Sequence, residues 1–170
     1  MSNYSTCLEI ILEHEGGFVN HPKDPGGITN YGVTKKVYDK WVGRETTPKE
    51  MRDLTHEDVA PIYKKNYWNR AKCDQLPMGV DLCVFDWAVN SGVSRSAKAL
   101  QRIVGVEQDG GIGPMTLQAV AEVEPEEIIE QMHYTRQNFY EKLSTFDTFG
   151  KGWTRRNDET KEKALEMLHG

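Results

Sequence analysis

Hydrophobic residues recur at helical spacing along most of the chain. In the first segment Leu8, Ile11 and Leu12 fall on one helix face, and Thr6 with Glu9 has the spacing of a capping box. Two glycines at 16 and 17 are expected to end this helix. The same criteria predict further helices from Thr34 to Trp41, from Pro48, from Thr55 to Trp68, from Ser94 to Gly105, from Pro114, over about 125–143 and over about 157–168.

Residues 79–91 differ from the other helical segments because they are apolar on nearly every face. Such a helix has no side suited to water, so we expect it to be the buried centre of the fold. Pro61 falls inside a predicted helix, where it removes one backbone hydrogen bond and predicts a bend. Residues 18–33 contain two prolines and three glycines, which indicates a loop and one small β-hairpin.

These elements predict a mainly α fold of the α+β class, with about seven to eight helices and one small N-terminal β-hairpin. The length of 170 residues and the buried central helix favour a single compact domain over residues 1–170. The turn-rich stretch from Gly105 to Gly113 is the one candidate boundary. Residues 149–153 are expected to form a turn before the last helix, because they contain two glycines.

Composition narrows the function classes. The chain has 21 Lys and Arg against 26 Asp and Glu, a net charge of −5, and lacks a basic stripe, so no nucleic-acid partner is expected. No apolar stretch approaches the roughly 20 residues of a membrane span, so no membrane insertion is expected. The N-terminal segment is acidic and unlike a secretory signal peptide. Cys7, Cys73 and Cys83 have unrelated spacings, which favours three buried free thiols.

Glu15 is the first candidate for catalysis, as the last residue before the chain leaves its first helix. A carboxylate is unusual there, because the partial negative charge at a helix C-terminus repels it. Asp24 follows nine residues later and Thr29 five after that, both in the predicted hairpin. Glycoside hydrolysis needs one carboxyl that donates a proton to the leaving oxygen and a second polar group that orients water. We therefore expect Glu15 as the acid, Asp24 as the water-orienting partner and Thr29 as its helper.

A simpler interpretation of Asp24 stays open. The run Asp24-Pro25-Gly26-Gly27 has the residue types of a plain turn, and those types explain it fully. If Asp24 only shapes this turn, the catalytic base lies elsewhere, or the amide of the retained sugar takes part.

Aromatic and amide side chains form a second set of candidates, since sugar rings pack on aromatic faces and sugar hydroxyls need polar partners. Tyr31, Asn90 and Trp153 are the expected substrate-binding residues. Trp68 and Trp87 are more typical of core positions.

Asp86 lies inside the apolar segment 79–91. A buried carboxylate needs partners, which Arg95, Arg155 or Arg156 could supply. Structural ion pairs and active sites both use such groups, so its role stays open between the two.

Two other catalytic classes fit the sequence less well. A metal peptidase would use His14, His21 and Asp24, but their spacing is not that of an HExxH motif, and no metal is expected. A Cys–His amidase would need Cys7 and His14. These lie about 10 Å apart along one helix, which is too far for a dyad.

The segment EHEGGFVNHPKDPGGITNYGVT, residues 13–34, resembles the N-terminal signature of glycoside hydrolase family 108. The resemblance continues at Tyr63, at Tyr67-Trp68 and through FDWAVNSG at residues 85–92. From about residue 95 to residue 167 the chain is similar to a predicted peptidoglycan-binding segment, with DGGIGPMTL at 109–117 and a Gly152-Trp153 pair followed by Arg156. The resemblance thus covers nearly the whole chain.

This resemblance implies a lysozyme-like N-acetylmuramidase with Glu15 as its acid. Residues 5–93 would be the catalytic segment, and residues 95–167 a peptidoglycan-binding segment packed on it. The substrate would be the β-1,4 bond between N-acetylmuramic acid and N-acetylglucosamine. No cofactor is expected, because glycoside hydrolysis needs only carboxyls and water. A peptidoglycan-binding or secretion-accessory protein without catalysis is the alternative, and the intact Glu15-Gly16-Gly17 run argues against it.

The spacing is also similar to that of phage-type lysozymes, which place Asp nine residues after a helix-end Glu and Thr six beyond. This chain matches the first interval, but its second interval is five. Asn30, Tyr31 or Thr34 could therefore replace Thr29. By this likeness the reaction would invert the anomeric centre.

The resemblance suits a monomeric phage or prophage endolysin. Such an enzyme would stay in the host bacterial cytoplasm until a holin opens the membrane, and would then act on the cell wall in the periplasm. A secreted bacterial effector with an immunity protein is the second setting.

Overall fold

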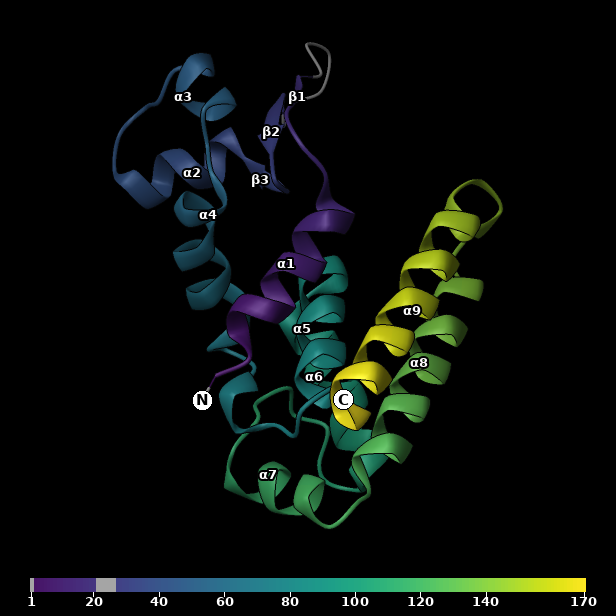
Figure 1. Cartoon of the computed structure of the whole chain (residues 1–170). Helices are drawn as coiled ribbons and strands as arrows, with labels where there is room; N and C mark the ends of the chain where they lie inside the picture. The colour runs from purple at the N-terminus through teal and green to yellow at the C-terminus, as the bar shows by residue number, and fades with distance from the viewer. Residues whose placement is uncertain (1, 21–26) are drawn as a thin grey trace. The chain divides into compact units, whose positions relative to one another are not determined.

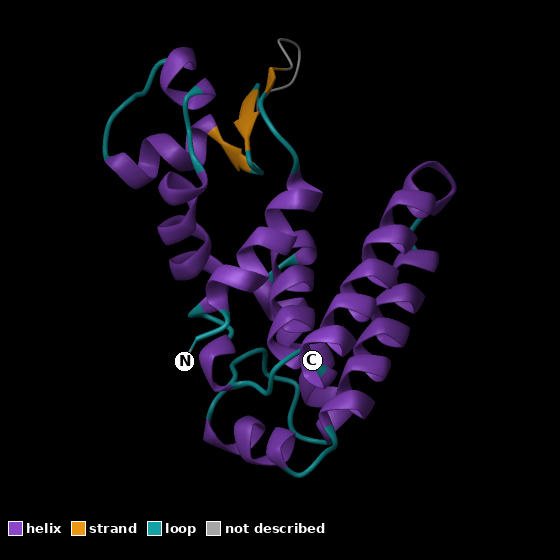
Figure 2. Ribbon diagram, in the orientation of Figure 1, coloured by secondary structure: helices purple, strands orange, loops and turns teal. Residues whose placement is uncertain are grey.

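The computed structural model describes residues 2–20 and 27–170 and confirms a mainly α protein with a small β element (Figure 2). Within these residues the chain forms nine α-helices and three strands, against the seven to eight helices and one hairpin expected. It divides into two compact units. We call Leu8–Asn66 the N-terminal unit, and we call the residues up to Cys7 together with Tyr67–Gly170 the helical unit. A single domain over residues 1–170 stays a prediction.

The N-terminal unit contains a small antiparallel sheet of three strands in the order β1-β2-β3. The register places Val19 opposite Thr29 and Asn30 opposite Val33. The strands are β1 (Val19–Asn20), β2 (Ile28–Asn30) and β3 (Val33–Thr34). The helices of this unit are most of α1 (Tyr4–Glu15), then α2 (Lys35–Val42), α3 (Pro48–Arg52) and α4 (His56–Tyr63).

Short polar side chains set where several of these helices begin. The Thr34 side chain accepts a hydrogen bond from the Val37 N–H, which confirms Thr34 as the cap of α2. Thr55 forms a capping box with Asp58 at the start of α4, which confirms that a helix begins after Thr55. The capping box predicted at Thr6 and Glu9 is wrong. Helix α1 begins at Tyr4, whose N–H donates to Ser2 Oγ, so Thr6 lies within the helix rather than before it.

Pro61 changes the helix that contains it. Regular α-helix ends at Tyr63 and continues as a π-helical turn (Lys64–Trp68). At the junction the Lys64 N–H is shared between the carbonyls of Ala60 and Pro61. A proline has no N–H and crowds the carbonyl four residues before it, so Pro61 removes the helical bond to the Glu57 carbonyl, whereas the irregular turn follows three residues later.

The helical unit is built around α5 (Val80–Ser91) (Figure 1). Residues 80–88 are all buried, so the prediction of a central buried helix is confirmed. Helix α5 packs against α6 (Val93–Val104), α8 (Pro125–Glu141) and α9 (Phe146–His169), and α8 and α9 lie side by side and antiparallel. Trp68, Trp87 and the three free cysteines are buried, as expected. A short 3₁₀-helix (Cys73–Gln75) precedes α5, and α7 (Pro114–Ala121) packs on α6.

The turn predicted at residues 149–153 is wrong, because these residues lie inside α9. Gly150 is buried, and a Cβ atom at this position would lie 2.5 Å from the Phe146 ring. The glycine is there for close packing rather than for a turn. Trp153 stacks on Tyr140 of α8 with ring centroids 5.2 Å apart. This contact offsets the roughly 1 kcal/mol by which a glycine weakens a helix.

The DGGIGPMTL segment at residues 109–117 forms a loop before α7 and the start of that helix, and the Gln101 side chain holds this loop by hydrogen bonds. Gln101 Nε2 contacts Asp109 Oδ1, the Gly111 carbonyl and Thr116 Oγ1 at 2.9–3.2 Å. The Gly110 N–H donates to Gln101 Oε1 at 3.0 Å. These bonds give the motif a structural role, because they satisfy the loop's polar groups around one buried amide.

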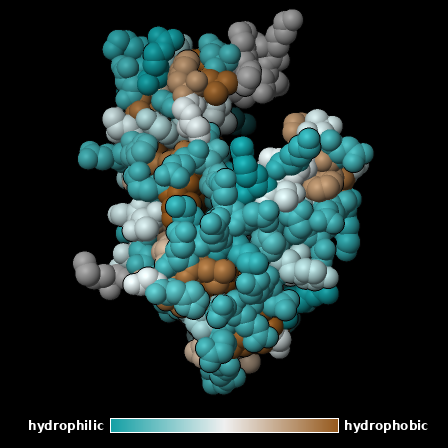
Figure 3. Space-filling view, turned by 45° about the vertical axis from the view of Figure 1, so that its right-hand side comes forward, coloured by the Kyte–Doolittle hydropathy of each residue, from teal (hydrophilic) through white to brown (hydrophobic). Residues whose placement is uncertain are grey.

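The face shown in Figure 3 is mostly hydrophilic, with hydrophobic residues in scattered patches. No helix in the described part of the chain is long and apolar enough to cross a membrane.

Candidate active site

Glu15 is the last residue of α1, as the sequence predicts. Its side chain is half-buried. Gly16 follows with φ +77°, a left-handed conformation that glycine adopts without strain, and its N–H donates to the Leu12 carbonyl. The helix therefore stops directly after the carboxyl group.

A strained turn lies beside this helix end. Tyr31 and Gly32 join β2 to β3 in a two-residue hairpin, with φ +49° and +76°. Such turns favour Asn-Gly, since both central residues are left-handed, and a tyrosine at the first position costs about 1 kcal/mol or more. Helix α4 contacts the turn through two residues about two helical turns apart, Tyr63 and His56. The Tyr63 hydroxyl donates to the Tyr31 carbonyl at 2.7 Å, and the His56 ring meets the Tyr31 ring edge to face at 4.8 Å.

Gly32 brings this turn against the candidate acid. A Cβ atom built on Gly32 would lie 3.0 Å from both Cβ and Oε2 of Glu15, and closer still to the Tyr63 hydroxyl oxygen. The Glu15 carboxylate and the Tyr63 hydroxyl thus approach the same point, next to backbone that carries no side chain. Glycine is required at position 32 for both its φ and the space.

Of the other candidate catalytic residues in the sheet region, some have a structural role and the rest stay predictions. Asn30 is buried, and its Nδ2 donates to the Met51 carbonyl at 2.8 Å, which ties β2 to α3. The Thr34 side chain caps α2. Thr29 is half-buried in β2, opposite Val19 and Thr34. Asp24 lies outside the described residues. The catalytic roles of Asp24 and Thr29 stay predictions.

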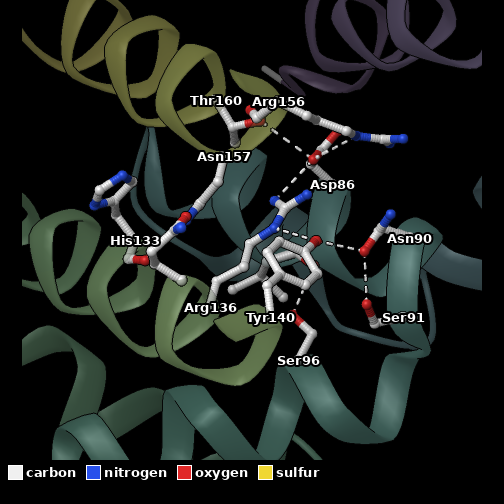
Figure 4. A network of polar contacts seen from close by, with 12 residues as sticks. Asp86, Asn90, Ser91, Ser96, His133, Arg136, Tyr140, Arg156, Asn157 and Thr160 are labelled. Carbon is white, nitrogen blue, oxygen red and sulfur yellow. Dashed lines mark hydrogen bonds and ion pairs between the residues drawn. The ribbon is translucent and has the colours of Figure 1, made fainter. Parts of the chain in front are cut away.

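The second polar centre belongs to the helical unit and surrounds Asp86 (Figure 4). Asp86 is fully buried on α5. Its carboxylate accepts from Arg136 Nη1 at 2.8 Å, from Arg156 Nη2 at 3.0 Å and from Thr160 Oγ1 at 3.2 Å. Burial alone would raise the pKa of Asp86, but the two guanidiniums outweigh it and hold the pKa well below its usual range. Asp86 is therefore an ionised structural anchor and not a proton donor.

The Asp86 centre extends to the residues expected to bind substrate. Arg136 Nε donates to the Tyr140 hydroxyl at 2.8 Å, and that hydroxyl donates to Asn90 Oδ1 (Figure 4). Tyr140 also carries Trp153 on its ring face, and Phe149 lies 5.7 Å from Trp153 with 54% of its surface exposed. Asn90 and Trp153 therefore share one support, Tyr140. Both side chains are half-buried, and their role in substrate binding stays a prediction.

Several of these residues were missed by sequence reasoning. Of the three arginines proposed for Asp86, only Arg156 pairs with it, and Arg95 lies instead over the Phe139 ring at 4.3 Å. Arg136 gave no local signal, since its partner lies 50 positions away. Gly32 had one, because it follows Asn30-Tyr31 in a stretch with hairpin composition.

Cys7 is unsuited to the nucleophile role of the amidase alternative. It is fully buried, and burial, followed by the charge of Asp81, raises the pKa of its thiol far above the usual range. In residues 2–20 and 27–170, no three His, Cys, Asp or Glu side chains are grouped so that they could hold a metal ion.

A helix-end carboxylate beside a small sheet, joined in sequence to a helical segment, is a frame suited to glycoside hydrolysis. The model of the family Glycosyl hydrolase 108 matches residues 8–92, and a model described as a Predicted Peptidoglycan domain matches residues 95–158. The chain belongs to glycosyl hydrolase family 108. The solved structure of Brucella abortus SagA is similar, with 41% sequence identity, coverage of 99% of this chain and 97% of that chain, and a TM-score of 0.86. No curated protein matches the chain.

Proposed function

We propose that this protein is a peptidoglycan hydrolase that cleaves the β-1,4 bond between N-acetylmuramic acid and N-acetylglucosamine. The observation that carries the proposal is the position of Glu15. Its carboxyl group ends α1 within the family-matched region, against the Gly32 backbone. The peptidoglycan domain matched at residues 95–158 supports peptidoglycan as the substrate.

In the proposed reaction Glu15 donates its proton to the glycosidic oxygen as the bond to the anomeric carbon breaks. Positive charge develops on the sugar ring, and a water molecule adds to the anomeric carbon from the opposite face. That water loses its proton to a base, for which Asp24 is our candidate, with Thr29 as the helper that orients the water. The products are a free hydroxyl on N-acetylglucosamine and a reducing N-acetylmuramic acid end. Inversion follows from attack on the opposite face.

Tyr31, Asn90 and Trp153 are proposed to bind the sugars. Tyr31 belongs to the turn beside Glu15, where its ring is half-buried. Asn90 and Trp153 are both supported by Tyr140, which keeps an amide and an aromatic face together. Preformed surfaces of this kind lose little conformational entropy on binding.

The test is digestion of purified Gram-negative sacculi by the wild type, by Glu15→Gln and by Glu13→Gln. Glu13 is an exposed glutamate two positions earlier in α1, so it controls for loss of one charge on this helix. We expect Glu15→Gln to lose about 10²–10⁴-fold in rate, the usual contribution of a general acid, and Glu13→Gln to keep its activity. Mass analysis should find muropeptides with reducing N-acetylmuramic acid ends.

Each other result has a defined meaning. Products lighter by one water would identify a lytic transglycosylase instead of a hydrolase. Equal activity of Glu15→Gln and wild type would remove Glu15 as the acid. If no variant cuts but all sediment with sacculi, the chain is a binding protein.

The biological setting is a separate part of the proposal. An endolysin held in the cytoplasm would lyse a Gram-negative host only when co-expressed with a holin. Lysis without a holin would contradict this setting. A secreted effector would instead be neutralised by an immunity protein that binds it.

A further inference from the structure

A groove of about 830 Å³ lies in the helical unit, apart from the Asp86 centre and from the Tyr140 support. Its walls come mainly from α6 and α8, and residues of the link between α7 and α8 also line it. No step of the proposed hydrolysis uses it. Most of its lining residues fall within the segment matched by the peptidoglycan domain.

The charged residues that line this groove are unevenly distributed along it: the cations are Arg95, Arg102 and Lys142, and the anions are three glutamates. Arg95, at the start of α6, lies over the Phe139 ring near the end of α8, which places these two residues at the same end of the groove. Lys142 stands at that same end of the groove, directly after α8. Glu122, Glu124 and Glu127 line the opposite end, at and before the start of α8. One end of the groove is therefore basic and the other carries three carboxylates, with the Arg102 guanidinium lining the groove seven residues after Arg95 on α6, towards the acidic end.

These charged groups are available to a ligand. All six are exposed, and no ion pair joins any of them to another residue in the described part of the chain, although Arg95 contacts the Phe139 ring. Between the two ends the wall holds Tyr134, which is 63% exposed. Gln131 and Asn138 are further lining residues, and their amides can bind a peptide backbone.

The glycan strand of peptidoglycan is a poor match for this charge pattern, because its amino sugars are N-acetylated and carry no cation. Its stem peptide matches better, since it combines carboxylates with the free amine of a diamino acid. Glu127 and Lys142 are fifteen residues apart along α8, about 22 Å between their backbones, whereas four extended peptide residues span about 14 Å. The side chains at the two ends must therefore reach inward by about 8 Å together for one peptide to contact both.

We propose that this groove binds the stem peptide of peptidoglycan. A carboxylate of the peptide lies at the Arg95–Lys142 end, and the amine of its diamino acid lies at the Glu122–Glu127 end. The inference rests on the proposed function for its choice of ligand, because it assigns the peptide part of the same substrate to a second site. Cleavage and peptide binding then use different residues of one chain.

The test is titration of the full chain, carrying Glu15→Gln, with the free tetrapeptide L-Ala-γ-D-Glu-meso-diaminopimelate-D-Ala. Backbone amide NMR shifts locate the peptide, and the concentration dependence gives Kd. We expect shifts along α6 and α8, and a Kd at least tenfold weaker in Lys142→Glu. Lys163→Glu is the matched control, because Lys163 is an exposed lysine of α9 outside the groove and should leave Kd unchanged.

A modified peptide tests the acidic end. Acetylation of the diaminopimelate amine should weaken binding to the parent chain. It should not weaken binding to Glu127→Lys, because the side chain that pairs with this amine already has the opposite charge in that variant. Equal binding of both peptides by the parent chain would overturn the inference. So would shifts that lie outside α6 and α8, or binding of peptide-free glycan strands in the groove.

The result is independent of the catalytic proposal, because the free peptide contains no glycosidic bond. Peptide binding in the groove by a chain whose wild type releases no muropeptides would refute the hydrolase and leave the groove assignment intact. Active digestion without peptide binding would do the reverse.

Discussion

Each unit of this protein contains one notable carboxylate, and the surroundings of the two carboxylates differ. Asp86 in the helical unit is fully buried and receives two guanidiniums and a hydroxyl. Glu15 in the N-terminal unit is half-buried at a helix end, against a glycine backbone and a tyrosine hydroxyl. Both belong to stretches that resemble the family signature. The difference teaches that a carboxylate held by two arginines in the interior supports structure, whereas the half-buried carboxylate at a helix end is the one that our proposal assigns to catalysis.

The packing around Asp86 and around Glu15 also differs between the two units. The helical unit has long helices around a buried α5, with its polar bonds made across helices. The N-terminal unit has short elements, and α2 has no buried residue, with Val37 and Trp41 exposed. It also contains the left-handed Tyr31. Strain and light packing are typical of functional regions, since stability there is given up for geometry.

The largest expected effect on stability comes from Asp86→Asn. This change leaves Arg136 and Arg156 beside a neutral group in the interior, so we expect the free energy of unfolding to fall by about 3–5 kcal/mol. Glu15→Gln should change it by less than about 1 kcal/mol, because its site is only half-buried. Urea unfolding monitored by tryptophan fluorescence measures both. Similar losses in the two variants would remove the distinction between the units.

The next effect comes from Gly32→Ala. Alanine is strained at φ +76°, and its methyl group would press on Glu15 and on the Tyr63 hydroxyl. We expect a loss of about 2–4 kcal/mol in unfolding free energy and at least a roughly tenfold loss of sacculus digestion. Gly43→Ala is the matched control, because Gly43 has φ +80° with nothing within 4 Å of an added Cβ. It should lose only the backbone part and keep its activity; an equal loss of activity in both variants would mean that contact with Glu15 is irrelevant.

The same contrast explains how much could be predicted from the sequence. Local signals were sufficient for the burial of α5, the Thr34 cap and the position of Glu15, because each depends on residues within a few positions. They were insufficient for the partners of Asp86, since Arg136 approaches from a helix 50 residues away.

Residues 149–153 show how packing overrides a local preference. Two glycines predicted a turn, but Trp153 stacks on Tyr140 and Gly150 lies against Phe146, and these contacts keep α9 continuous. The Tyr31-Gly32 turn shows the opposite case. Its hairpin composition was visible, whereas the approach of Gly32 to Glu15 depends on how the strands and α1 pack.

A smaller effect is expected for Tyr140→Phe, which tests the link between the Asp86 centre and the substrate-binding candidates. The change removes the hydroxyl between Arg136 Nε and Asn90 Oδ1 and leaves a buried donor without its acceptor. We expect a loss of about 1–3 kcal/mol in unfolding free energy, together with a raised KM for soluble glycan strands. Tyr134→Phe, at an exposed tyrosine of the same helix, should change stability by no more than about 0.5 kcal/mol. If KM stays constant in Tyr140→Phe, the bond to Asn90 does not orient that side chain for substrate.

The smallest expected effect is on the pH dependence of stability, which should differ between an exposed and a buried ion pair. A hydrogen bond from Arg44 lowers the pKa of Glu50 to about 2, and the pKa of Asp86 also lies below its usual range. Both groups take up protons more readily in the unfolded chain. Their contributions are therefore present above about pH 4 and are lost as the pH falls through the folded pKa.

The two groups should nevertheless differ in size and in response to salt. The Arg44–Glu50 pair is solvent-exposed, so Glu50→Gln should shift the acid-unfolding curve between about pH 5 and pH 2 only slightly, and about 0.5 M NaCl should abolish that shift. Asp86→Asn should flatten the same curve markedly at either salt concentration, because water and ions do not reach the buried pair. Circular dichroism against pH at low and high salt makes the comparison. A salt-sensitive contribution from Asp86 would show that its cluster opens to solvent, and the division between a structural and a chemical carboxylate would then fail.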